Sequence, residues 1–301
     1  MIRLANVRKL FGERVAVHDL TLAVARGEIF GLLGHNGAGK STVIGMLLGQ
    51  VWATAGDISV CGHNVQRRRQ DALRQVGAIF EAPVFYDYLS GWKNLEILSS
   101  YTASTPKERL QEVVDWVGLT GRIHSKVRTY SHGMRARLAL AQALLPRPEL
   151  LILDEPSDGL DPEGIHEMRH TIVRLHRELG LTILLSSHLL HEVEQLCTRI
   201  AVLNQGKKVF EGAIHEAKKP RSWLRLRVDA FEKAIDELQR GGLISDHRDG
   251  AFVELAKGIE SHAVVEFLIK RGQRVHEFAF EEETLERFYL NLMKGQVADK
   301  N

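Results

Sequence analysis

A chain of 301 residues has room for one large or two modest domains, and 44% hydrophobic with 26% charged residues is ordinary globular composition. Forty basic against 38 acidic residues leave a formal net charge of +2, which does not by itself indicate a nucleic-acid or lipid partner. Because no run of about 18 uncharged apolar residues occurs, and basic residues interrupt the start, neither a membrane span nor a signal peptide is expected.

The first part of the chain predicts strands that lead into a phosphate-binding turn. Residues 2–24 alternate apolar and polar side chains around a turn at 11–13, which favours two antiparallel strands. The apolar run 29–33 predicts a buried strand, the segment after Thr42 predicts a helix, and residues 56–62 predict a further strand and turn.

Between the buried strand and the helix lies G-H-N-G-A-G-K-S-T, which fits the phosphate-loop pattern at every fixed position. Its glycines let backbone N–H groups converge on an anion, and the helix N-terminus adds partial positive charge. We expect Lys40 to reach the β- and γ-phosphates of ATP, and the Ser41 hydroxyl to ligate Mg²⁺. The alternative is a glycine-rich turn without a ligand. The predicted ATP-binding residues are Gly34, His35, Asn36, Gly37, Ala38, Gly39, Lys40, Ser41 and Thr42.

The middle of the chain predicts helices inserted between strand-rich halves. Helical spacing dominates from about residue 84 to 148, and alternation of strands with helices resumes after it. This order predicts a mostly parallel sheet covered on both faces. The predicted helices cover 67–74, 95–101, 106–118, 135–145 and 165–179, and the strands cover 76–80, 150–155, 181–185 and 200–204.

After Pro220 the pattern changes to β-α-β-β-α-β with a final helix over 284–293, which predicts a small split βαβ domain. We therefore expect an α/β phosphate-loop domain over 1–218 and an accessory α+β domain over 219–301.

Two adjacent carboxylates, Asp154 and Glu155, end the buried strand that begins at Leu150. Ligands bind at the carboxyl ends of strands in open α/β sheets, so Asp154 is expected to hold Mg²⁺. Glu155 is placed to deprotonate the water that attacks the γ-phosphate. Alone, such a pair would more often be a solvated turn, but the upstream phosphate loop favours the catalytic interpretation.

Three further segments resemble motifs of the ATP-binding-cassette (ABC) ATPases over residues 1–215: 130–134 their signature, 159–161 their D-loop and 186–188 their switch histidine. The resemblance implies that His188 contacts the γ-phosphate. It also implies that Ser131 and Gly133, in the signature with His132 and Met134, contact ATP bound in a second subunit, and that Asp161 links the two sites. Ser131 would also suit a helix N-cap.

Some positions depart from the common ABC pattern. Glu81 stands where most of these ATPases have a glutamine that contacts Mg²⁺, and it could still ligate the metal. His132 and Met134 replace a glycine and a glutamine. Together with the segment 282–289, these features resemble the type-2 exporters, particularly the bacitracin-resistance and lantibiotic-immunity ATPases. In many ABC ATPases an aromatic residue near Phe11 stacks on adenine, but a core role for Phe11 is an equal alternative.

The resemblance implies an ATPase subunit at the cytoplasmic face of the membrane, which pairs with a second copy around two MgATP. This dimer is expected to drive a separate permease. The subgroup implies export, linked to antibiotic resistance. The aromatic stretch 85–88 is the predicted permease-docking surface. The alternative is a soluble ABC protein acting on nucleic acid or ribosomes. A single cassette and the absence of a dense basic arm disfavour it, so no nucleic acid is expected.

Overall fold

The computed structural model describes residues 1–81, 83–101, 105–217, 223–248, 251–280 and 284–298. The chain divides into two compact units, Met1–Ile214 and His215–Asn301, so the first unit ends four residues before the predicted boundary at residue 218.

A six-stranded sheet forms the centre of the first unit, with the order β10-β9-β3-β8-β7-β6. Five strands are parallel, and β10 pairs antiparallel with β9 at one edge. The strands are β3 (Ile29–Leu33), β6 (Val76–Ile79), β7 (Leu150–Asp154), β8 (Thr182–Ser187), β9 (Arg199–Asn204) and β10 (Lys207–Ala213). Because β3, β7 and β8 are parallel neighbours, the loops that follow them meet at one edge of the sheet.

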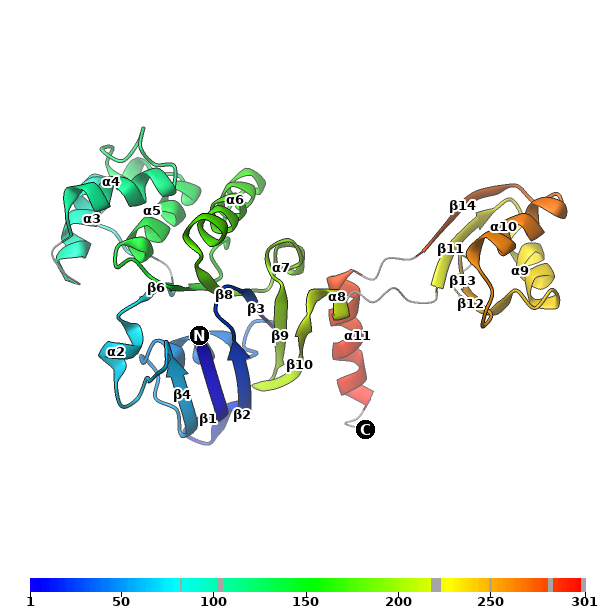
Figure 1. The fold of residues 1–301 in the computed structure, drawn as a ribbon, viewed down its shortest axis with the longest axis horizontal. Helices are drawn as coiled ribbons and strands as arrows, with labels where there is room; N and C mark the ends of the chain where they lie inside the picture. Colours follow the sequence, from blue (N-terminus) through cyan, green and yellow to red (C-terminus); the bar gives the residue numbers. More distant parts are fainter. Residues whose placement is uncertain (82, 102–104, 218–222, 249–250, 281–283, 299–301) are drawn as a thin grey trace. The chain divides into compact units, whose positions relative to one another are not determined.

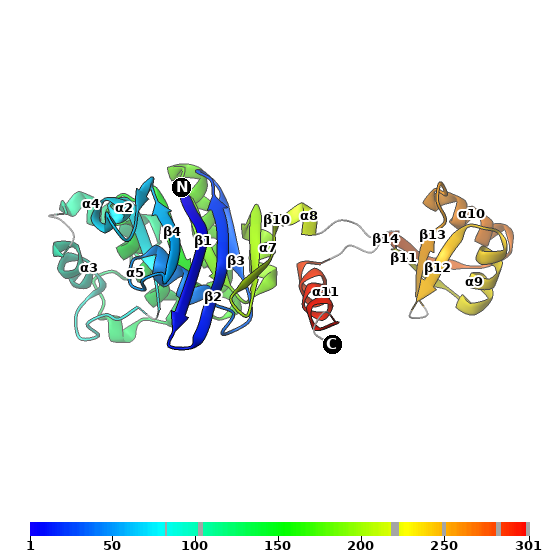
Figure 2. The same cartoon turned by 90° about the horizontal axis from the view of Figure 1, so that it is seen from below.

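A second, antiparallel sheet has the order β2-β1-β4-β5, and Figure 2 shows its strands β2, β1 and β4 side by side. Its strands are β1 (Ile2–Phe11), β2 (Arg14–Val24), β4 (Ala55–Val60) and β5 (His63–Asn64). Helix α1 (Lys40–Leu47) shares one core with both sheets, in which Leu4, Ile44 and Ile152 are fully buried. This shared core fixes the start of α1, and with it the phosphate loop, against the parallel sheet.

The predicted helical insertion is confirmed. Helices α3 (Gly91–Ser100), α4 (Lys107–Trp116) and α5 (His132–Leu144) pack against one another, and Figure 1 shows them grouped together. A short 3₁₀ turn, η1 (Val127–Thr129), precedes α5. The other helices of this unit are α2 (Arg69–Leu73), α6 (Pro162–Leu179) and α7 (Leu190–Leu196). Neither α7 nor β10 was predicted from the sequence.

Helix α5 packs closely on β6, and Gly77 allows this approach: a Cβ at Gly77 would lie 2.0 Å from the carbonyl oxygen of Ala143. Gly77→Ala is therefore expected to lower the free energy of unfolding by about 1–3 kcal/mol through overpacking, measured as a lower urea midpoint. Gly121→Ala is the matched control, because a Cβ there meets nothing within 4 Å. Equal midpoints for the two variants would contradict this account of the packing.

The second unit contains a four-stranded antiparallel sheet with the order β12-β13-β11-β14. Apolar residues of α9 and α10, such as Leu238 and Leu268, pack on Leu226 and Val253 of the sheet. The observed β-α-β-β-α-β order confirms the predicted split βαβ pattern. The elements are α8 (Ile214–Ala217), β11 (Trp223–Val228), α9 (Phe231–Arg240), β12 (Ile244–Arg248), β13 (Phe252–Leu255), α10 (Ser261–Lys270), β14 (Val275–Phe280) and α11 (Leu285–Ala298).

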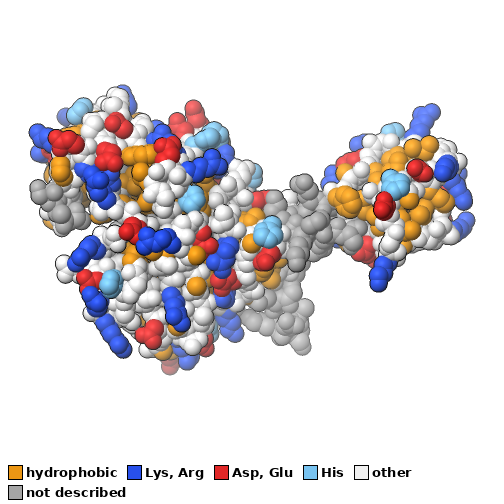
Figure 3. Space-filling view, viewed as in Figure 1, with side chains coloured by type: hydrophobic (Ala, Val, Ile, Leu, Met, Phe, Trp, Pro, Cys, Tyr) orange, Lys and Arg blue, Asp and Glu red, His pale blue; other side chains and the backbone are white. Residues whose placement is uncertain are grey.

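The described surface mixes both signs of charge. On the face drawn in Figure 3, Lys and Arg side chains are interspersed with Asp and Glu. Among the described residues, no helix combines the length and apolar character needed to cross a bilayer. Of the C-terminal segment singled out in the sequence, Glu282 and Glu283 lie outside the described residues, and Thr284 accepts a hydrogen bond from the Arg287 N–H at the start of α11.

Candidate functional site

The phosphate loop connects β3 to α1 and lines a pocket of about 500 Å³. Gly39 is the N-cap of α1 with φ 107°, a conformation that favours glycine. Lys40 is the first residue of the helix and is only 5% exposed, with its Nζ donating to the carbonyl oxygen of Gly34 at 2.8 Å. The predicted residues that line this pocket are Asn36, Gly37, Gly39, Lys40, Ser41, Thr42 and Glu155.

Two further loop residues, His35 and Ala38, join the loop to the segment 204–206. His35 contacts Asn36 O through Nδ1 and Asn204 Oδ1 through Nε2, which ties the loop to the end of β9. Ala38 is fully buried and its carbonyl accepts the Gly206 N–H at 2.9 Å. Gly206 also lines the pocket, together with Arg14, Val15, Ala16 and Gln205, none of which the sequence analysis identified.

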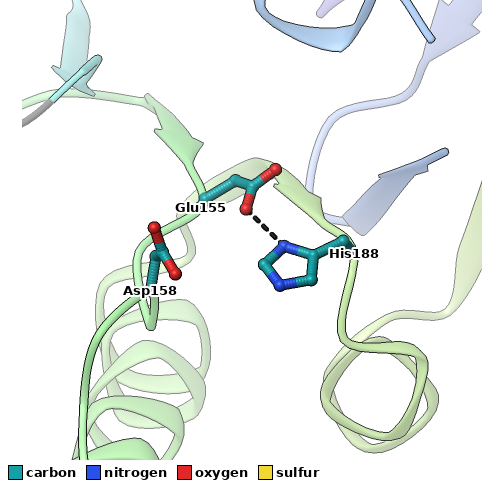
Figure 4. Close-up of side chains that lie close together, drawn as sticks. All are labelled: Glu155, Asp158 and His188. Carbon is teal, nitrogen blue, oxygen red and sulfur yellow. Dashed lines mark hydrogen bonds and ion pairs between the residues drawn. The ribbon is translucent and has the colours of Figure 1, made fainter. Parts of the chain in front are cut away.

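A chain of polar contacts joins three predicted catalytic residues. Lys40 Nζ lies 3.1 Å from Glu155 Oε1, and the other carboxylate oxygen, Oε2, lies 2.5 Å from His188 Nδ1. Figure 4 shows Glu155 and His188 pointing toward each other, with Asp158 beside them. One ligand atom from each of Glu155, Asp158 and His188 lies within 4.8 Å of the others. Three parallel strands thus bring the lysine, the glutamate and the histidine to one place.

The surroundings of Glu155 keep its carboxylate ionised. Burial acts to raise the pKa of Glu155, but the hydrogen bond and charge of Lys40, helped by His188, outweigh it and leave the pKa below its ordinary value. Its backbone has φ 48°, in the left-handed region that few non-glycine residues adopt. A carboxylate held in this way can accept a proton from water while its position is fixed.

Ser186 is a residue that the sequence analysis did not single out as part of the site. It lies on β8 opposite Asp154 of β7, donates its hydroxyl hydrogen to Asp154 Oδ1 and accepts the Glu155 N–H at 3.0 Å. This one side chain therefore holds the carboxylate of Asp154 and the backbone of Glu155. Its place at the end of a neighbouring parallel strand, directly before Ser187 and His188, is the signal that could have identified it.

The predicted metal ligands line a second hollow of about 720 Å³ beside the first. Ser41, Glu81 and Asp154 all line it, together with Glu155 and His132. Hydroxyl and carboxylate oxygens are the donors that Mg²⁺ takes in proteins, so this set fits the ion. Glu81 has φ 60°, a left-handed backbone conformation that differs from the extended conformation of the preceding strand.

Three of the signature residues, Ser131, His132 and Gly133, line a third hollow of about 520 Å³ together with Asp161, and His132 also lines the second hollow. Ser131 is the N-cap of α5 and accepts the Met134 N–H at 3.2 Å, and Asp161 caps α6 by accepting the Gly164 N–H at 2.8 Å. Neither Ser131 nor Gly133 lines the phosphate-loop pocket of its own chain.

Phe11 is not among the residues that line the phosphate-loop pocket. It is 50% exposed at the end of β1, and the Nζ of Lys9 lies 4.5 Å from its ring centre. Its partner across the hairpin, Arg14, does line the pocket.

Comparison with known proteins gives the same family from sequence and from structure. Residues 17–158 match the model of the ABC transporter family. An uncharacterised ABC transporter ATP-binding protein of Bacillus subtilis, YhcH, is 41% identical over 100% of this chain and 98% of its own length. This chain belongs to the ABC transporter ATP-binding proteins.

Further similarities refine the assignment. The bacitracin transport ATP-binding protein BcrA of Bacillus licheniformis is 36% identical to this ABC protein over 98% of both chains. A solved structure of an ABC transporter ATP-binding subunit superposes with a TM-score of 0.64 at 29% identity, covering 72% of this chain and 91% of that one. The predicted fold and the resemblance to the bacitracin-resistance subgroup are confirmed.

Membership in this family confirms the predicted ATPase activity. This ABC protein binds ATP and hydrolyses it, and it is the ATP-binding subunit of a transporter.

Proposed function

We propose that this ABC ATPase drives export through a separate integral-membrane permease at the cytoplasmic face of the membrane, as a dimer around two MgATP. The observation that carries the catalytic part is the continuous contact from Lys40 through Glu155 to His188 at the carboxyl ends of three strands. The transport part is supported by similarity to a bacitracin transport protein over nearly the whole chain.

The proposed reaction assigns one task to each residue. Lys40 binds the β- and γ-phosphates, while backbone N–H groups of Gly34 to Thr42 surround them. Glu155 takes a proton from the attacking water, and His188 contacts the γ-phosphate. Ser41, Asp154 and Glu81 would hold Mg²⁺, which neutralises charge on the phosphate oxygens when bound. Phe11 stays a proposed adenine contact.

Dimerisation is supported by the position of the signature. Ser131 and Gly133 open into their own hollow, with Asp161 at its wall and the phosphate loop in a different pocket. Two copies placed head to tail would bring each signature to the partner's ATP, where the N-terminus of α5 favours an anion. Asp161 would then lie between the two sites.

The proposed docking surface needs one correction. Phe85 was predicted to belong to it, but this side chain is buried, with only 8% of its surface exposed. Tyr86 and Tyr88 are 43% and 67% exposed, with ring centres 6.1 Å apart. The exposed part of the stretch is therefore this pair of tyrosines, which offers apolar rings and hydroxyl groups to a partner.

The combined Tyr86→Ala and Tyr88→Ala variant is expected to keep its basal ATPase activity and to lose transport and stable co-purification with the permease. A simultaneous loss of basal activity would contradict a docking role. Tyr101→Ala is the matched control, since Tyr101 is 77% exposed at the end of α3 and should leave both properties unchanged.

The function itself is tested by purifying the tagged chain from gently solubilised membranes of its native cell. We expect a stoichiometric polytopic membrane protein to accompany it. Recovery only in the soluble fraction with RNA or DNA attached would overturn the transporter proposal and favour the nucleic-acid alternative.

A further inference from the structure

Arg135 is a charged side chain at the ATPase site that the proposed reaction does not use. It lies on α5, one turn after the signature serine, and it lines the second hollow together with the carboxylates of Glu81, Asp154, Glu155 and Asp158. A guanidinium group beside these carboxylates is attracted to them, and it would compete with a metal ion for their oxygens. The contact that holds Arg135 in place therefore affects how this hollow binds a cation.

That contact is an ion pair with Asp87. Arg135 Nη2 donates to Asp87 Oδ1 at 2.6 Å, and the two side chains are 29% and 58% exposed. Asp87 itself lines neither the phosphate-loop pocket nor the second and third hollows. Because a partly exposed ion pair contributes little to the stability of a fold, its loss should leave the chain folded.

The backbone around Asp87 is attached to the turn that precedes the signature helix. The carbonyl oxygen of Asp87 accepts the Arg128 N–H at 2.9 Å, and the carbonyl oxygen of Leu89 accepts the Val127 N–H at 2.9 Å. These two bonds join the segment 86–89 to η1, directly before α5. The carboxylate of Asp87 is therefore presented to α5 by a segment whose backbone is fixed there.

The same segment is attached to α3 and carries the proposed docking surface. Asn94 of α3 is fully buried and binds both backbone groups of Tyr86, accepting its N–H at 2.8 Å and donating to its carbonyl oxygen at 3.1 Å. Asp87 stands between Tyr86 and Tyr88, the exposed pair of that surface. One short segment thus connects the docking surface with a side chain that lines the second hollow.

We propose that Asp87 is a positioning residue for the ATPase site: it holds the guanidinium group of Arg135 away from the carboxylates that bind Mg²⁺. Without this hold, Arg135 would pair with one of these carboxylates and weaken the binding of MgATP. A permease that moves Tyr86 and Tyr88 would move Asp87 with them, and would thereby change the affinity for MgATP. This inference rests on the proposed Mg²⁺ ligands and on the proposed docking surface.

The test measures equilibrium binding of a radiolabelled, non-hydrolysable ATP analogue to the full chain, once with Mg²⁺ and once with EDTA. Asp87→Asn removes the charge that holds Arg135 and keeps the size of the side chain. We expect the Kd with Mg²⁺ to rise about fivefold. The Kd in EDTA should not rise, because the freed guanidinium group competes with the metal ion and not with the phosphates. At saturating MgATP, kcat should stay within about twofold of its original value.

A double variant, Asp87→Asn with Arg135→Gln, removes the freed cation as well. Its Kd with Mg²⁺ should return to within about twofold of that of the unaltered chain. Asp87→Glu keeps the charge and should bind as the unaltered chain does. Asp71→Asn is the matched control, because Asp71 also pairs with arginines, Arg68 at 2.8 Å and Arg74 at 3.2 Å, but lines none of the three sites.

Three results would overturn the inference: an unchanged Kd in Asp87→Asn, a rise that persists in the double variant, or an equal rise in EDTA. Failure of the proposed function is recognised separately. Normal turnover in Glu155→Gln would count against the proposed reaction, and retained co-purification of the permease with the Tyr86→Ala and Tyr88→Ala variant would count against the docking surface.

Discussion

Glu155→Gln is expected to bind ATP and to hydrolyse it about 10²–10⁴-fold more slowly, the range that a general base contributes. The amide keeps the shape of the side chain but cannot take a proton from water. The variant still contains Lys40 and His188, the two residues that contact the side chain at position 155. The expected loss of activity is therefore assigned to the missing proton acceptor. The measurement is single-turnover hydrolysis after saturation with ATP, with bound nucleotide quantified separately.

The same substitution should tighten ATP binding. Lys40 is 5% exposed and pairs with Glu155 at 3.1 Å, so a γ-phosphate that binds Lys40 competes with this carboxylate. Glutamine weakens that competing pair and removes a negative charge from the vicinity of the phosphates. The Kd for ATP is therefore expected to fall relative to the unaltered chain.

Asp158→Asn is the matched control for the loss of a negative charge. Asp158 lies in the same cluster, but it is exposed and makes no contact with Lys40 among the interactions of the described residues. Its variant should hydrolyse ATP within a few-fold of the original rate. Normal turnover in Glu155→Gln would remove Glu155 as the base, and equal losses in both variants would assign the effect to charge rather than to proton transfer.

The parts of the site that could be predicted from the sequence are those written as local patterns. The phosphate loop requires glycines at fixed spacing between a strand and a helix, and Asp154 with Glu155 ends an apolar run, so both can be identified without any tertiary contact. The order of strands and helices follows from periodicity in the same way, and the structure has the predicted alternation.

Contacts between distant strands could not be predicted in this way. Ser186 reaches Asp154 only because β7 and β8 are parallel neighbours with these two residues in register. Helix α7 was missed because its seven residues follow directly on a buried strand, too short for helical spacing to stand out. Phe85 shows the opposite error: an aromatic stretch gives no information about which ring turns inward, and here it is Phe85.

Mixing two inactive variants tests whether the site is shared between chains. Lys40→Ala removes the phosphate contact, and Ser131→Arg places a bulky side chain in the signature hollow. Each variant alone is expected to lose nearly all ATPase activity, because both sites of its homodimer carry the lesion. Ser131→Arg also removes the N-cap of α5, which costs about 1 kcal/mol and should leave the chain folded.

In a head-to-tail mixed dimer, one site combines both lesions and the other has an intact phosphate loop and an intact signature. Random pairing makes about half of the dimers mixed, each with one intact site of two, so the mixture should regain about a quarter of the original activity. If each chain formed a complete site from its own Lys40 and Ser131, every site in the mixture would carry a lesion and no activity would return. Recovery on mixing, absent from either variant alone, therefore separates a shared site from one completed within a single chain.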